Sequence, residues 1–155
     1  MIPHETYMRK AVAEAEKAAE AGEVPVGAVI VCDGRIVGKA HNQVEMLHDP
    51  TAHAEMIAIT QAAEYQGDWR LEGMTLYVTI EPCAMCAGAI VLARLENVVY
   101  GAADPRFGAA GSAMNVFEDS ANMYRVKVKG GLLADECGHL LKQFFRGRRK
   151  AAPAG

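Results

Sequence analysis

Two short motifs, each placed where a helix is expected to begin, constrain this chain more than any other feature. The first is His53-Ala54-Glu55, and the second is Pro82-Cys83-Ala84-Met85-Cys86. One imidazole and two thiols make three potential metal ligands, one fewer than the four that usually close a structural zinc site. The fold must therefore bring two helix starts, far apart in the chain, to one point.

The spacing within the motifs suits a zinc ion with an open coordination position. Cys83 and Cys86 would share one side of a helix, and the dipole of its first turn favours thiolates. His53 and Glu55 could not both face a site from mid-helix, because residues i and i+2 lie about 200° apart, but they can flank a site at the helix start. Zinc would lower the pKa of a bound water toward about 7, and Glu55 would carry its proton to a leaving amine. The motifs predict a catalytic zinc centre for hydrolytic amino-to-oxo exchange on an aromatic ring.

Two alternatives remain open for these ligands. A fourth protein ligand, such as His48, would close the metal site and leave no place for water. A metal-free thiol pair could instead be a redox dithiol, but that use gives the imidazole and the carboxylate of the first motif no role. The other cysteines, Cys32 and Cys137, are expected to be small buried core residues.

Hydrophobic periodicity predicts one α/β domain over residues 1–150, followed by a disordered tail, 151–155. Helices are expected at residues 4–21, 53–65, 82–95 and 132–149. Strands are expected at residues 24–32, 35–40, 75–80, 97–100 and 124–129. The stretches 41–51 and 102–122 are expected to be loops. Such interleaving indicates a single three-layer α/β/α domain, with one sheet between helices.

The composition argues against a membrane-spanning or secreted protein, and it remains compatible with a nucleic-acid partner. The 155 residues are 51% apolar, as in ordinary globular domains, and no apolar run approaches the roughly 20 residues that span a bilayer. The first residues lack a secretory signal pattern, so a cytoplasmic protein is expected. The net charge of −3 gives no general attraction to RNA, but basic residues gather near the C-terminus: Lys142, Arg146, Arg148, Arg149 and Lys150.

Over nearly its whole length the chain resembles the bacterial tRNA-specific adenosine deaminases, which have the cytidine deaminase fold. Besides the two motifs, the resemblance is carried by residues 24–28, 41–42, 49–55, 75–78, 81–90, 108–112, 133–137, 144–146 and 148–149. It implies a five-stranded mixed sheet between helices, a homodimer with one Zn²⁺ per subunit, and no organic cofactor. It also implies conversion of adenosine to inosine at the wobble position of a tRNA anticodon. In such enzymes the target base flips out of the anticodon stem-loop into the zinc pocket.

The resemblance also implies RNA-binding roles by position. Asn42 would hydrogen-bond the flipped nucleoside, the backbone N–H of Ala54 would bind the base, and Asp104 would contact the neighbouring ribose or backbone. Stacking and charge from the last helix would hold the anticodon loop through Phe145, Arg148 and Arg149. Plainer alternatives exist: Asn42 and Asp104 could shape turns, Phe145 could belong to the core, and the arginines could be a solvated helix end.

Two further points concern assembly and rival functions. Residues 83–95 are apolar on nearly all sides, so this helix should be buried on more than one side. The second side would be covered either by a dimer partner or by other elements of the same subunit. The nearest rival function is deamination of a free base or nucleoside, guanine or cytosine/cytidine, on the same fold. A rival of another class is a non-enzymatic, zinc-stabilised RNA-binding module. The basic C-terminal helix and residues 49–55 favour an RNA substrate.

Overall fold

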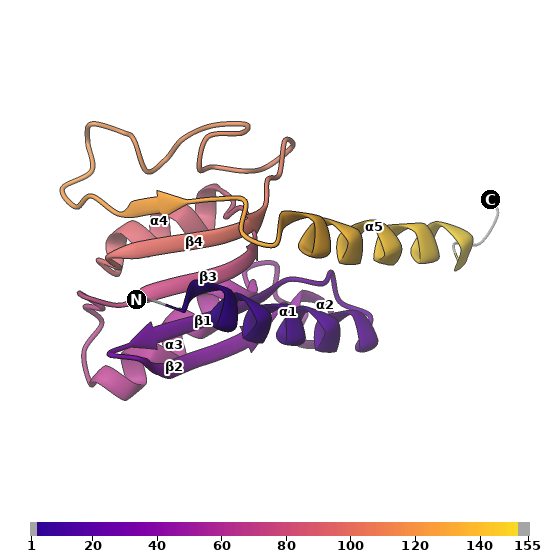
Figure 1. Cartoon of the computed structure of the whole chain (residues 1–155), viewed down its shortest axis with the longest axis horizontal. Coiled ribbons are helices and arrows are strands. Elements are labelled where there is room, and N and C mark those ends of the chain that lie inside the picture. The colour runs from indigo at the N-terminus through magenta and orange to yellow at the C-terminus, as the bar shows by residue number, and fades with distance from the viewer. Residues whose placement is uncertain (1–2, 152–155) are drawn as a thin grey trace.

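A five-stranded mixed sheet forms the middle of the protein (Figure 1). The computed structural model describes residues 3–151 and the side chains of residues 3–148. The strands are β1 (Gly27–Cys32), β2 (Arg35–His41), β3 (Thr75–Ile80), β4 (Asn97–Ala102) and β5 (Lys127–Lys129). They lie in the order β2-β1-β3-β4-β5, with β1 antiparallel to both neighbours and β3, β4 and β5 mutually parallel. The predicted five-stranded mixed sheet is thus confirmed.

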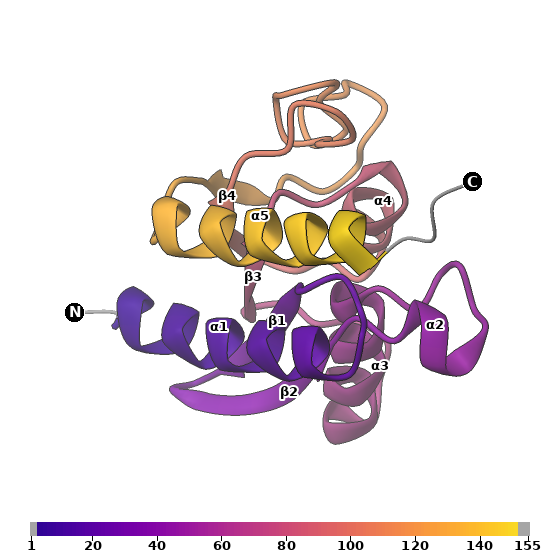
Figure 2. The same ribbon diagram turned by 90° about the vertical axis from the view of Figure 1, so that its right-hand side faces the viewer.

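Helices cover both faces of this sheet (Figure 2). One face carries α1 (His4–Glu20) and α5 (Ala134–Ala151), and the other carries α3 (Ala54–Gln66) and α4 (Ala84–Leu92). Successive residues of β3 serve the two faces in turn, because side chains alternate along a strand. Leu76 packs with Ala58 and Ile90 on the α3–α4 side, while Tyr77 packs with Met8 on the α1 side.

The hairpin between β1 and β2 forms as its turn residues predict. Asp33 and Gly34 have φ values of 49° and 77°, the left-handed conformations that a two-residue type I′ turn requires. The hairpin places the end of β2 beside the start of β1, where the backbone N–H of Asn42 donates to Val26 O at 3.1 Å. Asn42 is thereby fixed at the end of the sheet where the site is found.

Several predicted boundaries were wrong. The expected loop 41–51 contains a short helix, α2 (Val44–Leu47), whose first N–H groups donate to the buried Glu23 carboxylate. Pro82 was expected in the first turn of α4, but Cys83 is the N-cap, so the proline precedes the helix. The last strand keeps only residues 127–129 of the expected 124–129. The last helix begins later than expected and includes Ala151, the first residue of the predicted tail.

The rest of that tail, residues 152–155, lies outside the described residues, so its predicted disorder stays a prediction. No helix in the described part of the chain is long and apolar enough to cross a membrane. The neighbouring parallel strands β3 and β4 end at Ile80 and Ala102, and both chain segments continue from the same edge of the sheet. Open α/β sheets commonly bind ligands at this edge.

Candidate active site

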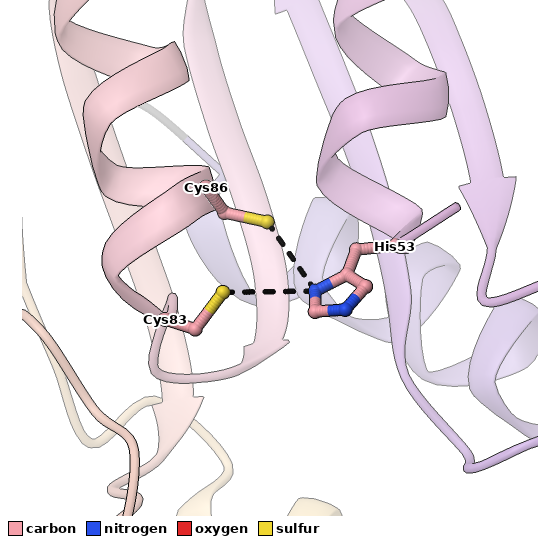
Figure 3. Close-up of side chains that lie close together, drawn as sticks. All are labelled: His53, Cys83 and Cys86. Atoms are coloured by element: carbon pink, nitrogen blue, oxygen red, sulfur yellow. Dashed lines mark hydrogen bonds between the residues drawn. The ribbon is translucent and has the colours of Figure 1, made fainter. Parts of the chain in front are cut away.

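Two helix starts meet beyond the end of β3, as the motifs predicted (Figure 3). His53 is the N-cap of α3, and its carbonyl accepts the N–H of Ile57 at 3.2 Å. Cys83 is the N-cap of α4, and Cys86 lies in the first turn of the same helix. Both thiols point toward the same imidazole nitrogen, so the two helix starts bring all three side chains to one point.

The distances among these side chains suit one metal ion. His53 Nδ1 lies 3.7 Å from Cys83 Sγ and 3.5 Å from Cys86 Sγ. A tetrahedral zinc with Zn–S near 2.3 Å and Zn–N near 2.0–2.1 Å would separate sulfur and nitrogen by about 3.6 Å. Within residues 3–148, the possible ligands grouped here are these three, and His48 is not among them. The described residues therefore offer a three-ligand centre rather than a closed one.

The two thiols differ in acidity. A hydrogen bond from Cys86, together with His53, lowers the pKa of the Cys83 thiol to about 4. The hydrogen bond donated to Cys83, with burial and the nearby Glu55 charge, raises the pKa of Cys86. The first thiolate thus forms readily, whereas the second needs a compensating positive charge. A bound divalent cation supplies such a charge and deprotonates its thiol ligands.

Glu55 lies beside this centre in the first turn of α3. Its side chain is only 2% exposed, and burial raises the pKa of its carboxyl group above the ordinary value. A buried carboxyl group placed beside the ligands can serve as a proton carrier for a reaction there. The structure therefore brings together Glu55, His53, Cys83 and Cys86, as the sequence predicted.

A cavity of about 770 Å³ opens in front of these residues. Its floor includes His53, Glu55 and Cys83, and its walls come from the end of β2, from α2, from the segment after β4 and from α5. Ligand cavities of roughly 300–1,000 Å³ are usual for small molecules. The space is adequate for one purine nucleoside above the three ligands.

Asn42 and Ala54 both line this cavity. Asn42 is 8% exposed, its Nδ2 donates to Val24 O at 3.4 Å, and its buried Oδ1 has no partner among the described residues. Ala54 is the first residue of α3, where backbone N–H groups lack intrahelical acceptors. Both residues thus lie at the cavity wall, and the substrate contacts expected of them stay predictions.

Asp104 lines the cavity as well, but its side chain stabilises a turn of the backbone. Its Oδ1 accepts the N–H groups of Arg106 at 3.0 Å and Phe107 at 3.2 Å, which is the turn-shaping alternative. The N–H of Asp104 itself donates to the Glu81 carboxylate at 3.1 Å. The structure shows the turn role of Asp104 directly, and a ribose contact stays a prediction.

The three predicted residues of α5 have different environments. Phe145 is 42% exposed and lines the cavity, so it is not an ordinary core residue. Arg148 Nη2 lies 3.7 Å from Glu45 Oε1 of α2, an exposed pair that links the two helices at the cavity. The side chain of Arg149 lies outside the described residues.

Sequence reasoning missed the two buried carboxylates that shape the cavity walls. Glu81 accepts hydrogen bonds from the backbone N–H groups of Asp104, Ala110 and Ser112, and from the Ser112 hydroxyl at 2.5 Å. Burial alone would raise its pKa, but these four donors outweigh burial and lower it. Glu23 holds α2 in the same manner. The available signal was an acidic residue at a strand or helix end beside apolar residues.

A close approach of the backbone accompanies the Glu81 contacts. A Cβ atom at Gly108 would overlap the carboxyl group of Glu81 and the carbonyl of Asp104. The segment 103–112, which we call the rim loop, can therefore wrap Glu81 only with glycine at this position. Glu81 adjoins the Pro82-Cys83 pair, so one short segment supports both the metal ligands and the cavity wall.

Comparison with known proteins places the chain in a family. The model of the MafB19-like deaminases matches residues 2–149. The tRNA-specific adenosine deaminase of Bacillus subtilis (strain 168) is 50% identical over 154 residues, covering 99% of this chain and 96% of that protein. The chain belongs to the tRNA-specific adenosine deaminase family.

Solved structures agree with this membership. A tRNA:A34 deaminase, studied for A-to-I editing at the wobble position of transfer RNA, has a TM-score of 0.85 and 43% identity. The match covers 88% of this chain and 99% of that one. A guanine deaminase from Bacillus subtilis has a TM-score of 0.65 and 34% identity, covering 99% of this chain and 98% of that chain. By TM-score and by sequence identity, the chain is nearer to the tRNA:A34 deaminase than to this guanine deaminase.

Proposed function

We propose that this chain converts adenosine to inosine at the wobble position of a tRNA anticodon by zinc-dependent hydrolysis. The observation that carries the proposal is the three-ligand group, of which His53 and Cys83 line the cavity, beside the buried carboxylate of Glu55. Family membership supplies the substrate class, because the relatives are named for that reaction on tRNA. A tRNA substrate would place the enzyme in the cytoplasm, as the sequence led us to expect.

The ligand set supports zinc as the metal. One imidazole and two thiolates are typical zinc donors, and the sulfur–nitrogen separations are near those of a tetrahedral site. His53, Cys83 and Cys86 would hold one ion per subunit. When bound, zinc supplies a water molecule whose pKa is lowered toward about 7.

Glu55 would manage the protons of the reaction. Its carboxylate would take one proton from the attacking water and deliver it to N1 of the adenine ring, where inosine keeps it. It would then pass the second proton, released as the hydroxyl on C6 becomes a carbonyl, to the amino group, which leaves as ammonia. Purine C6 thereby gains an oxygen and loses ammonia, so one water is consumed for each inosine formed. The raised pKa of Glu55 favours return of the proton within the same turnover.

The cavity walls would orient the flipped nucleoside. Asn42 would use its unpartnered Oδ1 to accept a hydrogen bond from the nucleoside, and the Ala54 N–H would donate to the base. Asp104 would contact the adjoining ribose or backbone from the rim loop. Stacking and charge on the anticodon loop would come from Phe145, Arg148 and Arg149.

We also propose a homodimer. Helix α4 buries Cys86, Ala87, Ile90 and Val91 against its own subunit, while Leu92 at its end is 75% exposed. A helix with apolar residues on a second side would gain from burial against a partner. Sedimentation analysis tests this, since Leu92→Asp should yield monomers if the partner packs there. A wild-type monomer at micromolar concentration would contradict the dimer.

An anticodon stem-loop with a wobble adenosine tests the activity. The wild-type chain should form inosine from the stem-loop and release one ammonia for each inosine, while free guanine and cytidine should remain unchanged. A stem-loop with the adenosine moved into the paired stem is the matched control, because a paired base is costly to flip. Turnover of free guanine or cytidine without turnover of the stem-loop would show the rival deaminase instead.

A further inference from the structure

Phe107 is a large apolar side chain placed at the mouth of the cavity. Its ring is 59% exposed, and it lines the same cavity as Phe145, which comes from a different element, α5. Single exposed apolar residues are common on protein surfaces and need no explanation. Here, however, two exposed aromatic rings border one cavity that leads to the metal ligands, so their position calls for a functional account.

The backbone that carries Phe107 is held firmly. Asp104 Oδ1 accepts the N–H of Phe107 at 3.2 Å, and Asp104 O accepts the N–H of Gly108 at 2.8 Å. The start of this turn and residues 110 and 112 are bonded in turn to the buried Glu81 carboxylate. An exposed ring on a fixed backbone loses little conformational entropy when a ligand stacks on it.

The neighbouring residue indicates the chemistry of that ligand. The guanidinium carbon of Arg106 lies 5.3 Å from the centre of the Phe107 ring, so a positive charge accompanies the aromatic face. Aromatic rings beside basic side chains are the usual means of binding unpaired nucleic acid, with bases stacked on the rings and cations on the phosphates. The cavity accommodates the target nucleoside, and the strand that enters and leaves it must pass its rim.

We propose that Phe107, with Arg106 beside it, forms a stacking subsite for a nucleobase directly adjacent to the target adenosine. The subsite rests on the proposed function, because it needs a single-stranded RNA whose target base enters the cavity. It assigns the rim loop a role in holding the neighbouring nucleotide, separate from the proton transfer at Glu55.

Kinetics on the anticodon stem-loop test the subsite. Phe107→Ala should raise KM by about 5- to 150-fold, the range of base–aromatic stacking, and leave kcat within about twofold. Phe107→Trp should restore KM, whereas Phe107→Leu, which is apolar but has no aromatic face, should behave like the alanine variant. Tyr65→Ala, which removes a 53% exposed ring from α3 away from the cavity, is the matched control and should change neither constant.

Stem-loops that lack one base identify the partner of the ring. When the abasic nucleotide replaces the neighbour that stacks on Phe107, KM of the wild type should rise as much as Phe107→Ala raises it on the intact stem-loop. Phe107→Ala should add no further rise on this substrate. With the abasic nucleotide on the other side, the alanine variant should still show its full effect. The subsite would be overturned if Phe107→Ala raised KM equally on the intact stem-loop and on both abasic stem-loops. Full activity of Phe107→Leu would also overturn it.

The outcomes separate the two proposals. If the wild type forms inosine normally and Phe107→Ala leaves KM unchanged, the subsite is wrong and the proposed function stands. If the wild type forms no inosine from the intact stem-loop, the proposed function fails and the subsite fails with it. Zinc content and melting temperature of each variant should match those of the wild type, because an exposed ring adds little to the core.

Discussion

The floor of the cavity and its rim are built in different ways. At the floor, the metal ligands and Glu55 lie at the N-caps or in the first turns of α3 and α4, whose apolar residues pack on the sheet. At the rim, exposed side chains sit on segments that are tied by hydrogen bonds to Glu81 and Asp104, or by the exposed Arg148–Glu45 pair. Changes at the floor should therefore abolish chemistry, while changes at the rim should alter RNA binding.

The largest effect is expected from removal of a metal ligand. Cys86→Ala should lose bound zinc and reduce inosine formation to background, because two ligands do not retain the ion against dilution. Metal analysis and the stem-loop assay measure both consequences. Cys32→Ala, which removes a thiol far from the centre, should keep zinc and activity. One equivalent of zinc retained in an active Cys86→Ala protein would refute the three-ligand centre.

A smaller but still large effect is expected at Glu55. Glu55→Gln should keep zinc and lower kcat by about 10²- to 10⁴-fold, the usual contribution of a positioned proton carrier. KM should change little, because the substitution preserves the shape of the floor. Glu64→Gln, on the exposed side of the same helix, is the control. A normal rate in Glu55→Gln would transfer the proton role to another residue.

The buried carboxylate of Glu81 belongs structurally to the rim. Glu81→Gln turns an amide N–H₂ toward backbone N–H groups that need an acceptor, so the free energy of unfolding should fall by about 2–4 kcal/mol. Ser112→Ala removes only one of the four bonds and should cost less. Urea denaturation of the zinc-loaded proteins measures the difference. Equal stability of Glu81→Gln and the wild type would mean that the rim loop does not depend on this carboxylate.

The floor was predictable from the sequence because its signals are local. His53, Glu55, Cys83 and Cys86 lie in two short motifs, and the loop that ends at Thr51 and the proline at position 82 indicate that each motif begins a helix. Glu81 was missed because its donors lie 23 to 31 residues further along the chain. Arg148 was predicted to contact RNA, but its pairing with Glu45 of α2 could not be predicted, because it depends on how two distant helices pack.

The same distinction applies to the fold. The alternation of Leu76 and Tyr77 between two cores follows from strand periodicity and was predictable. Helix α2 was not predicted, because its first N–H groups depend on the distant Glu23. The segment 124–126 was expected in the last strand for its alternating pattern, yet β5 pairs with β4 only over three residues. Pairing with a neighbour, rather than pattern, ended that strand.

A modest effect is expected from Arg148 at the rim. Arg148→Ala should reduce the slope of log binding constant against log salt by about 0.7 for each phosphate of a single-stranded loop that the arginine neutralises. Arg35→Ala, at the start of β2, is the matched control for charge. Titration of the stem-loop at several salt concentrations gives both slopes. An unchanged slope would make Arg148 a partner of Glu45 only.

The smallest effect concerns the support of β2 behind Asn42. Glu14 is buried, accepts a hydrogen bond from Lys17 at 2.7 Å, and lies 3.5 Å from His41 Nδ1. Burial alone would raise its pKa, but Lys17 and His41 outweigh burial and lower it below the ordinary 4.5. The resulting stability is present above that ordinary pKa and is lost as pH falls through the lowered value. Between pH 6 and pH 3, the wild type should therefore lose more stability than Glu14→Gln in urea titrations, and parallel losses would contradict this.

Gly108 sets a limit on how the rim can be redesigned. Side chains at positions 106 and 107 project from a backbone that is already fixed, so a library at these two sites would sample new neighbouring-base preferences. Any side chain at 108 would displace the Glu81 carboxyl group, which its Cβ would overlap. Because Glu81 adjoins the Pro82-Cys83 pair, that displacement would reach the metal ligands. Directed evolution of sequence context should thus vary the two sites before this glycine and leave the glycine unchanged.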